Sequence, residues 1–299
     1  MCQANLPGTQ TPLEFPVMRF LLSLATFILG ASASLAADPV PDSNRINGVA
    51  LGCQAYSFRL FSLSEAIEKT AASGAKVIEF YPGQKLSKAN PKGFSHDSPL
   101  EDRVYIKEQL KKNGLLVVAY GVVGLPANEK ESRKVFDFAK DMGIRVINTE
   151  GAPDAFDTIE KLVKEYDIKV GLHNHPRRAN NPNYKHWDPN WVLEMVRGRD
   201  KRIGACADTG HWIRSGLKPV DCIKILNGRV VSSHLKDLGE KLHDMPFGNG
   251  NADIAGILAE YRAQGMDGPV SIEYEHNWEK SLPEITDCVN FVKKWVPVK

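Results

Sequence analysis

The chain has 299 residues, of which 25% are charged and 42% hydrophobic, and its formal net charge is +2 at pH 7. This composition is that of an ordinary globular protein and argues against a disordered chain. Because positive and negative charges nearly balance, the sequence gives no reason to expect a nucleic-acid partner.

The first 37 residues are predicted to be a targeting segment rather than part of the folded domain. Residues 18–30 start with Met-Arg and continue as an apolar core, and the small residues that follow include Ser34-Leu35-Ala36, an acceptable cleavage site. This is the form of a secretory signal peptide, and its apolar core is shorter than the ~20 residues that a membrane span needs. An uncleaved N-terminal anchor is the alternative.

Translation is expected to start at Met18, because residues 1–17 contain three prolines and no lysine or arginine, unlike a signal peptide. The chain then divides into an N-terminal extension with its signal peptide, residues 1–37, and a mature domain, residues 38–299. The mature protein is expected to be secreted or periplasmic, with no membrane association after cleavage. Its cysteines are scattered and indicate neither a zinc ribbon nor a dense disulfide scaffold.

Strand-like and helix-like segments alternate through residues 38–299, which favours parallel βα units. The expected strands are residues 49–57, 76–81, 115–120, 146–150, 168–173, 203–207, 230–234 and 270–274. Helical patterns follow them at residues 63–73, 102–113, 130–142, 155–166, 190–197, 219–226, 253–264 and 282–295. The stretch 84–99 has no clear period and is expected to be an active-site loop. Eight strands in this order predict a single-domain α/β protein, a (β/α)8 TIM barrel.

Four of these strands are directly followed by residues of the types that bind metals. The segments are residues 172–176 (LHNHP), 206–211 (CADTGH), 230–237 (VVSSHLKD) and 271–276 (SIEYEH). A barrel of this kind has its active site at the carboxyl ends of its strands, so these residues are predicted to gather at one mouth. Alternation along each strand selects the inward-facing residues, which are Gly171, His173, His175, Ser232, His234, Lys236, Glu273 and Glu275.

A mixture of carboxylates and imidazoles at one mouth suits a single divalent metal ion, which would be Mn²⁺, Co²⁺, Zn²⁺ or Mg²⁺. Asp208, His234 and Glu273 are the strongest predicted ligands. Glu150, at the end of the fourth strand, is predicted to complete an open site that holds a water, with His173 and His175 as competitors. One such residue alone would as readily be a polar core group, but three at successive strand ends favour a metal site.

The motifs at the strand ends resemble those of the xylose isomerase-like barrels known as sugar phosphate isomerase/epimerases. The resemblance rests on the runs 208–211 (DTGH), 234–237 (HLKD) and 272–275 (IEYE), and the runs 173–176 (HNHP) and 248–250 (GNG) resemble one secreted-type branch. It covers essentially the whole mature chain. It implies one divalent metal ion bound by Asp208, His234, Glu273 and a residue of strand four or five. Since His173 replaces the strand-five glutamate of the epimerases, their paired-glutamate mechanism does not transfer directly. Dimers are common in the family, which leaves a homodimer as an expectation.

The chemistry expected of such a site starts from a ketose or 3-keto sugar, whose carbonyl and adjacent hydroxyl can chelate one metal ion. The ion would stabilise the enediolate that forms when the α-proton leaves. Candidates for the base and the acid are four side chains near the mouth, namely His173, His175, His211 and Glu275. Lys236 is expected to orient a substrate hydroxyl or stabilise an oxyanion, with a buried salt bridge as the alternative. Arg214 is a further candidate for holding an anionic or hydroxyl group.

Export argues against a phosphorylated intracellular sugar as the substrate. The leading prediction is therefore a metal-dependent isomerase or epimerase of a non-phosphorylated sugar or keto-sugar, with a small carbohydrate as its partner. A lyase or hydrolase of 3-keto-glycosides that uses the same enediolate is the first alternative, and a non-catalytic carbohydrate-binding barrel is the second. A nuclease of the endonuclease IV type is disfavoured, because the strands at 76–81 and 115–120 contain no histidine for a three-zinc cluster.

Overall fold

A computed structural model describes residues 1–3 and 39–296, and within them eight parallel strands close into a barrel. Neighbouring strands follow the order β1-β12-β9-β8-β7-β6-β5-β2, and pairing of β2 with β1 closes the ring. The barrel strands are β1 (Ala50–Gln54), β2 (Val77–Phe80), β5 (Leu116–Tyr120), β6 (Val146–Thr149), β7 (Lys169–His173), β8 (Ile203–Asp208), β9 (Val230–Leu235) and β12 (Pro269–Ile272). The predicted (β/α)8 TIM barrel is confirmed. The predicted signal peptide and its cleavage site lie outside the described residues.

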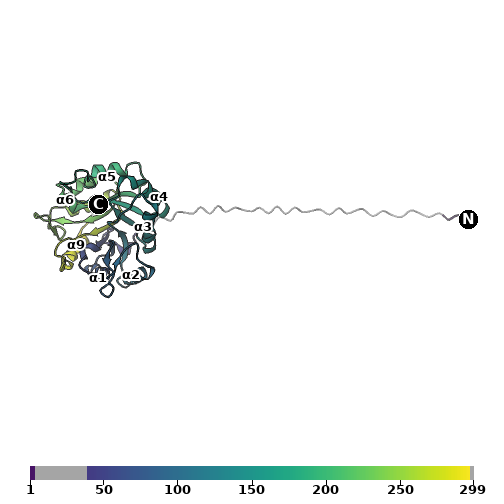
Figure 1. Cartoon of the computed structure of the whole chain (residues 1–299), viewed down its shortest axis with the longest axis horizontal. Helices are drawn as coiled ribbons and strands as arrows, with labels where there is room; N and C mark the ends of the chain where they lie inside the picture. The colour runs from purple at the N-terminus through teal and green to yellow at the C-terminus, as the bar shows by residue number, and fades with distance from the viewer. Residues whose placement is uncertain (4–38, 297–299) are drawn as a thin grey trace. The chain divides into compact units, whose positions relative to one another are not determined.

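Helices lie around the outside of the barrel (Figure 1). They are α1 (Leu63–Ser73), α2 (Leu100–Lys112), α3 (Glu129–Met142), α4 (Phe156–Tyr166), α5 (Pro189–Val196), α6 (Thr209–Arg214), α7 (Pro219–Leu226), α8 (Ile254–Ala263) and α9 (Leu282–Lys294). The helix α6 was not expected from the sequence, and it begins directly after β8. None of the helices in the described part of the chain is both long and apolar enough to span a bilayer.

Two short antiparallel hairpins stand outside the barrel sheet. One pairs β3 (Gln84–Lys85) with β4 (Gly93–Phe94), and the other pairs β10 (Asp237–Leu238) with β11 (Asp244–Met245). The first hairpin occupies the stretch that was expected to be an irregular loop. It is held against α1, because the backbone amide and the hydroxyl of Ser64 both donate to the carbonyl of Leu86.

Local signals in the sequence set the ends of α1. The Ser62 hydroxyl accepts from the backbone amide of Glu65, while the Glu65 carboxylate accepts from the Ser62 amide, which makes a capping box. Gly74 ends the helix with a φ of 85°, a left-handed conformation that glycine adopts without the steric penalty of a Cβ. The expected start and end of this helix are therefore explained by three residues.

The two faces of the barrel strands carry different kinds of side chain. Val170 and Leu172 on β7 are buried in the apolar core between the strands and the helices, as alternation predicts. The opposite face is polar halfway up the barrel, where Ser232 donates to Asn148 at 2.6 Å. Gly171 leaves room for this pair, since a Cβ there would lie 2.6 Å from Asn148 Oδ1 and 2.9 Å from Ser232 Oγ. The barrel interior therefore holds a hydrogen-bonded network below the mouth.

Candidate active site

A cavity of about 310 Å³ opens at the carboxyl ends of the strands. It is lined by Gln54, Tyr56, Tyr81, Pro82, Gly121, Val122, His173, His175, His211, Glu273 and Glu275. A larger cavity of about 630 Å³ lies around the amino ends of β1 and β12, but neither of the His/Asp/Glu clusters found among the described residues borders it. We therefore place the candidate site at the smaller cavity. The stretch 84–99, which was expected to be an active-site loop, contributes none of its lining residues.

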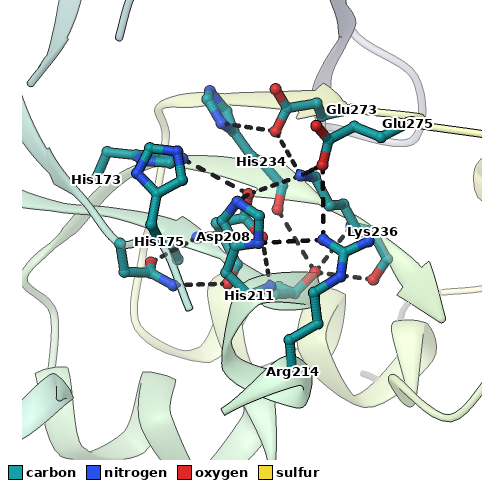
Figure 2. A network of polar contacts seen from close by, with 12 residues as sticks. His173, His175, Asp208, His211, Arg214, His234, Lys236, Glu273 and Glu275 are labelled. Atoms are coloured by element: carbon teal, nitrogen blue, oxygen red, sulfur yellow. Dashed lines mark hydrogen bonds and ion pairs between the residues drawn. The ribbon is translucent and has the colours of Figure 1, made fainter. Parts of the chain in front are cut away.

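Four side chains converge beneath this cavity in the manner of a metal site. His173, Asp208, His234 and Glu273 each offer one ligand atom, and these atoms all lie within 4.8 Å of one another. They come from the ends of β7, β8 and β9 and from the residue after β12, so sequential βα units place them side by side (Figure 2). All four are buried. The three predicted ligands are thus brought together, with His173 as the fourth member of the group.

The donor atoms of this cluster fit a bound cation. Within the described residues, both ring nitrogens of His173 are buried without a hydrogen-bond partner, and Asp208 Oδ2 and His234 Nδ1 have only ion-pair contacts, with Lys236 and Glu273. Buried polar atoms normally have hydrogen-bond partners, so this cluster calls for a group that its atoms can bind together. Imidazole nitrogens and carboxylate oxygens in this combination suit a divalent ion of the Mn²⁺, Co²⁺ or Zn²⁺ type.

Glu79 fixes the cluster from below. Its carboxylate is fully buried and lies 2.9 Å from His234 Nε2, and it accepts from Asn148 at 2.7 Å and from Ser271 at 2.7 Å. Because Nε2 of His234 faces Glu79, the ring turns its Nδ1 toward Glu273, 3.2 Å away. Burial acts to lower the pKa of His234, but Cys206 and the carboxylates of Glu79 and Glu273 outweigh it and raise that pKa well above its usual range.

Lys236 lies next to the cluster as a fully buried ammonium. Its Nζ is 3.1 Å from Asp208 Oδ2, 2.8 Å from Glu273 Oε2 and 2.6 Å from Glu275 Oε2. Burial acts to lower the pKa of Lys236, but these carboxylates outweigh it and hold the pKa well above its usual range. Lys236 does not line the cavity. Lys236 therefore makes the buried salt bridge that was the alternative, and its expected role toward a substrate stays a prediction.

Glu150 is engaged with other side chains at the cavity edge. Its Oε1 accepts from the Tyr184 hydroxyl at 2.5 Å and makes a short contact with Nδ1 of His175, while His173 Nδ1 lies 4.0 Å away. Burial acts to raise the pKa of Glu150, but hydrogen bonds from the two histidines and from Tyr184 outweigh it and lower that pKa well below its usual range. This geometry favours His173 over Glu150 as the fourth ligand. Tyr184 comes from the long connection between β7 and α5 and gave no signal in the sequence.

His211 follows Asp208 on the first turn of α6 and leans over the same site. The Asp208 carboxylate caps the helix by accepting from the His211 amide at 2.7 Å, and His211 Nε2 lies 3.5 Å from Asp208 Oδ2. On the other side of the ring, Nδ1 lies 3.1 Å from Nη1 of Arg214. Burial lowers the pKa of His211 well below its ordinary range, because the charged imidazole loses its hydration.

Two side chains that the sequence did not single out complete the surroundings. Asn174 donates to the carbonyl of Asp208 and accepts from its amide, both at 2.9 Å, so it fastens the end of β8 to the segment that carries His173 and His175. Asp244 lies 3.4 Å from Arg214 Nη2 and accepts from the amide of Glu275 at 3.2 Å. Alternation gives no signal for them, because Asn174 lies between two inward-facing histidines and Asp244 belongs to the β10–β11 hairpin outside the barrel sheet.

The Gly248-Asn249-Gly250 run forms a closed turn. The carboxylate of Asp237 accepts from the amides of Gly248 at 2.8 Å, Gly250 at 3.0 Å and Ala252 at 2.9 Å. These amides are thus satisfied by a side chain of the same chain. The turn explains the glycine at position 250, because a Cβ there would lie 2.3 Å from the Asp237 carboxylate.

A closed βα barrel with a buried His/Asp/Glu cluster at its mouth defines a class of barrel proteins equipped to hold a divalent ion in the active site. Within this class, the chain belongs to the xylose isomerase-like TIM barrel family, whose model matches residues 67–293. The resemblance predicted from the strand-end motifs is confirmed. The sequence matches no curated protein.

Similar solved structures agree with this assignment. An uncharacterised protein from Parabacteroides distasonis ATCC 8503 is 30% identical, with a TM-score of 0.67, and the match covers 83% of this chain and 99% of that one. A D-tagatose 3-epimerase-like protein is 19% identical, with a TM-score of 0.59 and coverage of 81% and 98%. A D-psicose 3-epimerase crystallised with D-fructose is 15% identical, with a TM-score of 0.61 and coverage of 81% and 99%. At these identities the last two show a shared fold.

Proposed function

We propose that this protein is a divalent-metal-dependent isomerase or epimerase of a non-phosphorylated sugar or keto-sugar. The observation that carries the proposal is the convergence of His173, Asp208, His234 and Glu273 below a cavity of about 310 Å³. The epimerases among the structural neighbours support the same class of reaction. The predicted signal peptide adds that the protein acts outside the cytoplasm, on sugars that occur there in free form.

The four clustered side chains would hold the metal ion, and the other cavity groups would act on the substrate. When bound, the ion supplies a Lewis acid that polarises the sugar carbonyl and its neighbouring hydroxyl. The proton removed from the carbon next to the carbonyl has three possible acceptors along the cavity wall, namely His175, His211 and Glu275. Tyr56 and Tyr81 also line the cavity, and a sugar ring can pack against them.

A neutral substrate fits this cavity better than a sugar phosphate. Among its lining residues there is no lysine or arginine. The two cations beside the ligand cluster are already paired, since Lys236 contacts Asp208, Glu273 and Glu275 while Arg214 lies beside Asp244 and Glu275. On this side of the cavity a phosphate would therefore compete with carboxylates for both cations.

A lyase acting on 3-keto-glycosides is the second candidate, favoured by the position of two imidazoles. The ring centroids of His175 and His211 are 5.1 Å apart and their planes differ by 31°. A sugar sandwiched between two rings would need about 7–8 Å at ordinary van der Waals distances, so both rings lie on one side of any bound substrate. A lyase can remove the proton and protonate the expelled oxygen from the same face of the sugar. An epimerase must return the proton from the other side, for which Glu275 is the available acid.

Proton exchange in D₂O tests the proposal directly. The mature protein, loaded with Mn²⁺ or Co²⁺, is incubated with free ketoses and 3-keto-glycosides. The protein and the metal ion are then removed, and the products are examined by NMR. Deuterium next to the carbonyl is expected with the wild type and absent or strongly reduced with Asp208→Asn, which replaces the anionic ligand by a neutral amide of the same shape. An epimer or isomer would establish the first candidate, and an unsaturated product the second. Stoichiometric metal binding without exchange on any of these substrates would reject both in favour of a binding protein.

A further inference from the structure

The two cavity imidazoles have different hydrogen-bond partners at Nδ1. In His211 this atom lies 3.1 Å from Nη1 of Arg214, and in His175 it contacts the carboxylate of Glu150. An arginine guanidinium donates hydrogen bonds and never accepts them, whereas an ionised carboxylate only accepts. Arg214 therefore requires an unprotonated ring nitrogen in His211, whereas Glu150 requires a protonated one in His175.

For His211, the contact with Arg214 requires a lone pair on Nδ1. A neutral imidazole with an Nδ1 lone pair carries its proton on Nε2. That nitrogen lies on the side of the ring facing the metal cluster, 3.5 Å from Asp208 Oδ2. Arg214 is itself held in place by Glu275, 3.6 Å away, and by Asp244, 3.4 Å away. Figure 2 shows the guanidinium between His211 and Glu275.

For His175, the contact with Glu150 requires a proton on Nδ1 and leaves the Nε2 lone pair free. The Tyr184 hydroxyl donates to the same Glu150 oxygen and also accepts from the His175 backbone amide at 2.9 Å. Ring and backbone of His175 are thus fixed by one pair of neighbours. The side chain remains 39% exposed, so its free nitrogen is accessible from the cavity that it lines.

We infer that Arg214 and Glu150 are positioning residues that fix the two cavity imidazoles in opposite tautomers. His175 presents a lone pair to the substrate, and His211 presents an N–H. On the proposed function, on which the assignment of roles rests, Nε2 of His175 takes the proton from the carbon next to the carbonyl. The electron pair of the broken C–H bond moves toward the carbonyl oxygen, and His211 donates a hydrogen bond to a substrate oxygen. For an isomerase the proton then returns from His175 to the neighbouring carbon, for an epimerase Glu275 protonates the opposite face, and for a lyase the expelled oxygen takes a proton from His211.

The tautomers can be read without any substrate by long-range ¹H–¹⁵N NMR of ¹⁵N-histidine-labelled, Mg²⁺-loaded protein. Spectra would be recorded at about pH 8, above the ordinary histidine pKa of ~6.5. The eight histidines of the chain are few enough to assign by loss of the His175→Gln and His211→Gln signals. We expect Nδ1 of His211 and Nε2 of His175 to have the downfield shift of an unprotonated nitrogen. The reverse assignment at either ring would overturn the inference for that ring.

Variants of Arg214 and Glu150 then show whether these residues fix the tautomers of the two histidines or only stabilise the fold. Arg214→Met keeps the length of the side chain but cannot donate, so the His211 tautomer preference should be lost, and Arg214→Lys should restore it. Arg103→Met removes a guanidinium paired with Asp141 on the surface and should leave both rings unchanged. Glu150→Leu should release the His175 tautomer while His211 keeps its own. An unchanged His211 spectrum in folded Arg214→Met would refute the role of Arg214.

Turnover of a substrate tests the roles of the two histidines separately from their tautomers. On any substrate that exchanges deuterium, His175→Gln should abolish exchange, while His211→Gln should slow it and leave some exchange measurable. The opposite ranking would refute the assignment of base and acid even if the tautomers are as inferred. If no substrate is turned over, the proposed function fails, and the NMR result still decides the tautomers.

Discussion

Replacing Glu79 by leucine is expected to weaken divalent metal binding although Glu79 is not a member of the ligand cluster. The carboxylate lies 2.9 Å from His234 Nε2 and thereby turns Nδ1 of the same ring toward the other ligands. Carboxylates that orient a metal-binding histidine typically contribute 10–100-fold to affinity, which is about 1.4–2.7 kcal/mol. The expected change in the metal Kd is of this order.

The same substitution should also lower the stability of the metal-free protein. Glu79 Oε1 serves Asn148 as well as His234, and Oε2 accepts from Ser271. Leucine would leave these groups buried without their acceptor, and breaking a buried charged network of this kind costs about 3–5 kcal/mol. Urea unfolding of the metal-free protein measures this loss, and calorimetric titration with Mn²⁺ or Co²⁺ measures the affinity separately.

Two further variants show whether orientation of the ring is the cause. Glu79→Gln removes the charge but retains an oxygen that can accept from His234, so it should recover most of the affinity. Ser271→Ala removes one donor to Oε2 and leaves the His234 contact intact, so metal affinity should stay at the wild-type value. Wild-type affinity in a folded Glu79→Leu protein would refute the reasoning. Equal losses in the leucine and glutamine variants would assign the effect to charge instead.

Three further perturbations follow from the structure. Burial raises the pKa of the Asp244 carboxyl from 3.8 to about 6, so the folded protein binds more protons than the unfolded chain between these values. Relative to Asp244→Asn, the wild type should therefore lose up to about 3 kcal/mol of unfolding free energy as the pH rises from about 4 to about 7. Urea unfolding measures this, and a difference between the two proteins that does not change with pH would contradict the prediction. Asn47→Ala should cost about 1–2 kcal/mol in thermal unfolding, because its amide donates to the carbonyls of Val292, Lys293 and Trp295 at the end of α9, whereas Asn249→Ala on the surface should change little. Gly171→Ala should destabilise by about 1–3 kcal/mol, since the added methyl would lie 2.6 Å from Asn148 Oδ1, while Gly124→Ala has no atom within 4 Å of its new methyl and serves as the control. Equal stability of the two glycine variants would show that the interior adjusts to the methyl group.

The fold could be predicted because each barrel strand is an apolar run and an amphipathic helix follows most of them. The same periodicity explains what was missed. Helix α6 has only six residues and contains Gly210, so no helical pattern was visible. The glycine is required by packing that a sequence does not show, because a Cβ at Gly210 would lie 2.8 Å from the Lys236 side chain.

Those residues of the candidate site that lie at the ends of barrel strands could be predicted from strand alternation. Asp208, His234 and Glu273 belong to strand ends, and the barrel closes them into one cluster with His173. Which of Glu150, His173 and His175 joins the cluster as the fourth predicted ligand depends on hydrogen bonds with residues outside the strands. Tyr184 engages Glu150 from a long loop whose course no periodic pattern determines. The partners of Arg214 were hidden for the same reason, since Asp244 belongs to the β10–β11 hairpin.

The division of the barrel into a ligand side and a neutral side limits what the site can bind. The clustered ligands come from β7, β8, β9 and β12, which are consecutive in the ring, while Gln54, Gly121 and Val122 come from β1 and from the residues after β5. At the mouth the buried charges gather on the ligand side, where the ammonium of Lys236 and the carboxylates satisfy each other, while the buried carboxylate of Glu79 on β2 lies below them. Buried ion pairs of this kind add little net stability, because desolvation offsets their attraction. The apolar core between strands and helices must then supply most of the folding free energy, which leaves the interior free to position the reacting groups.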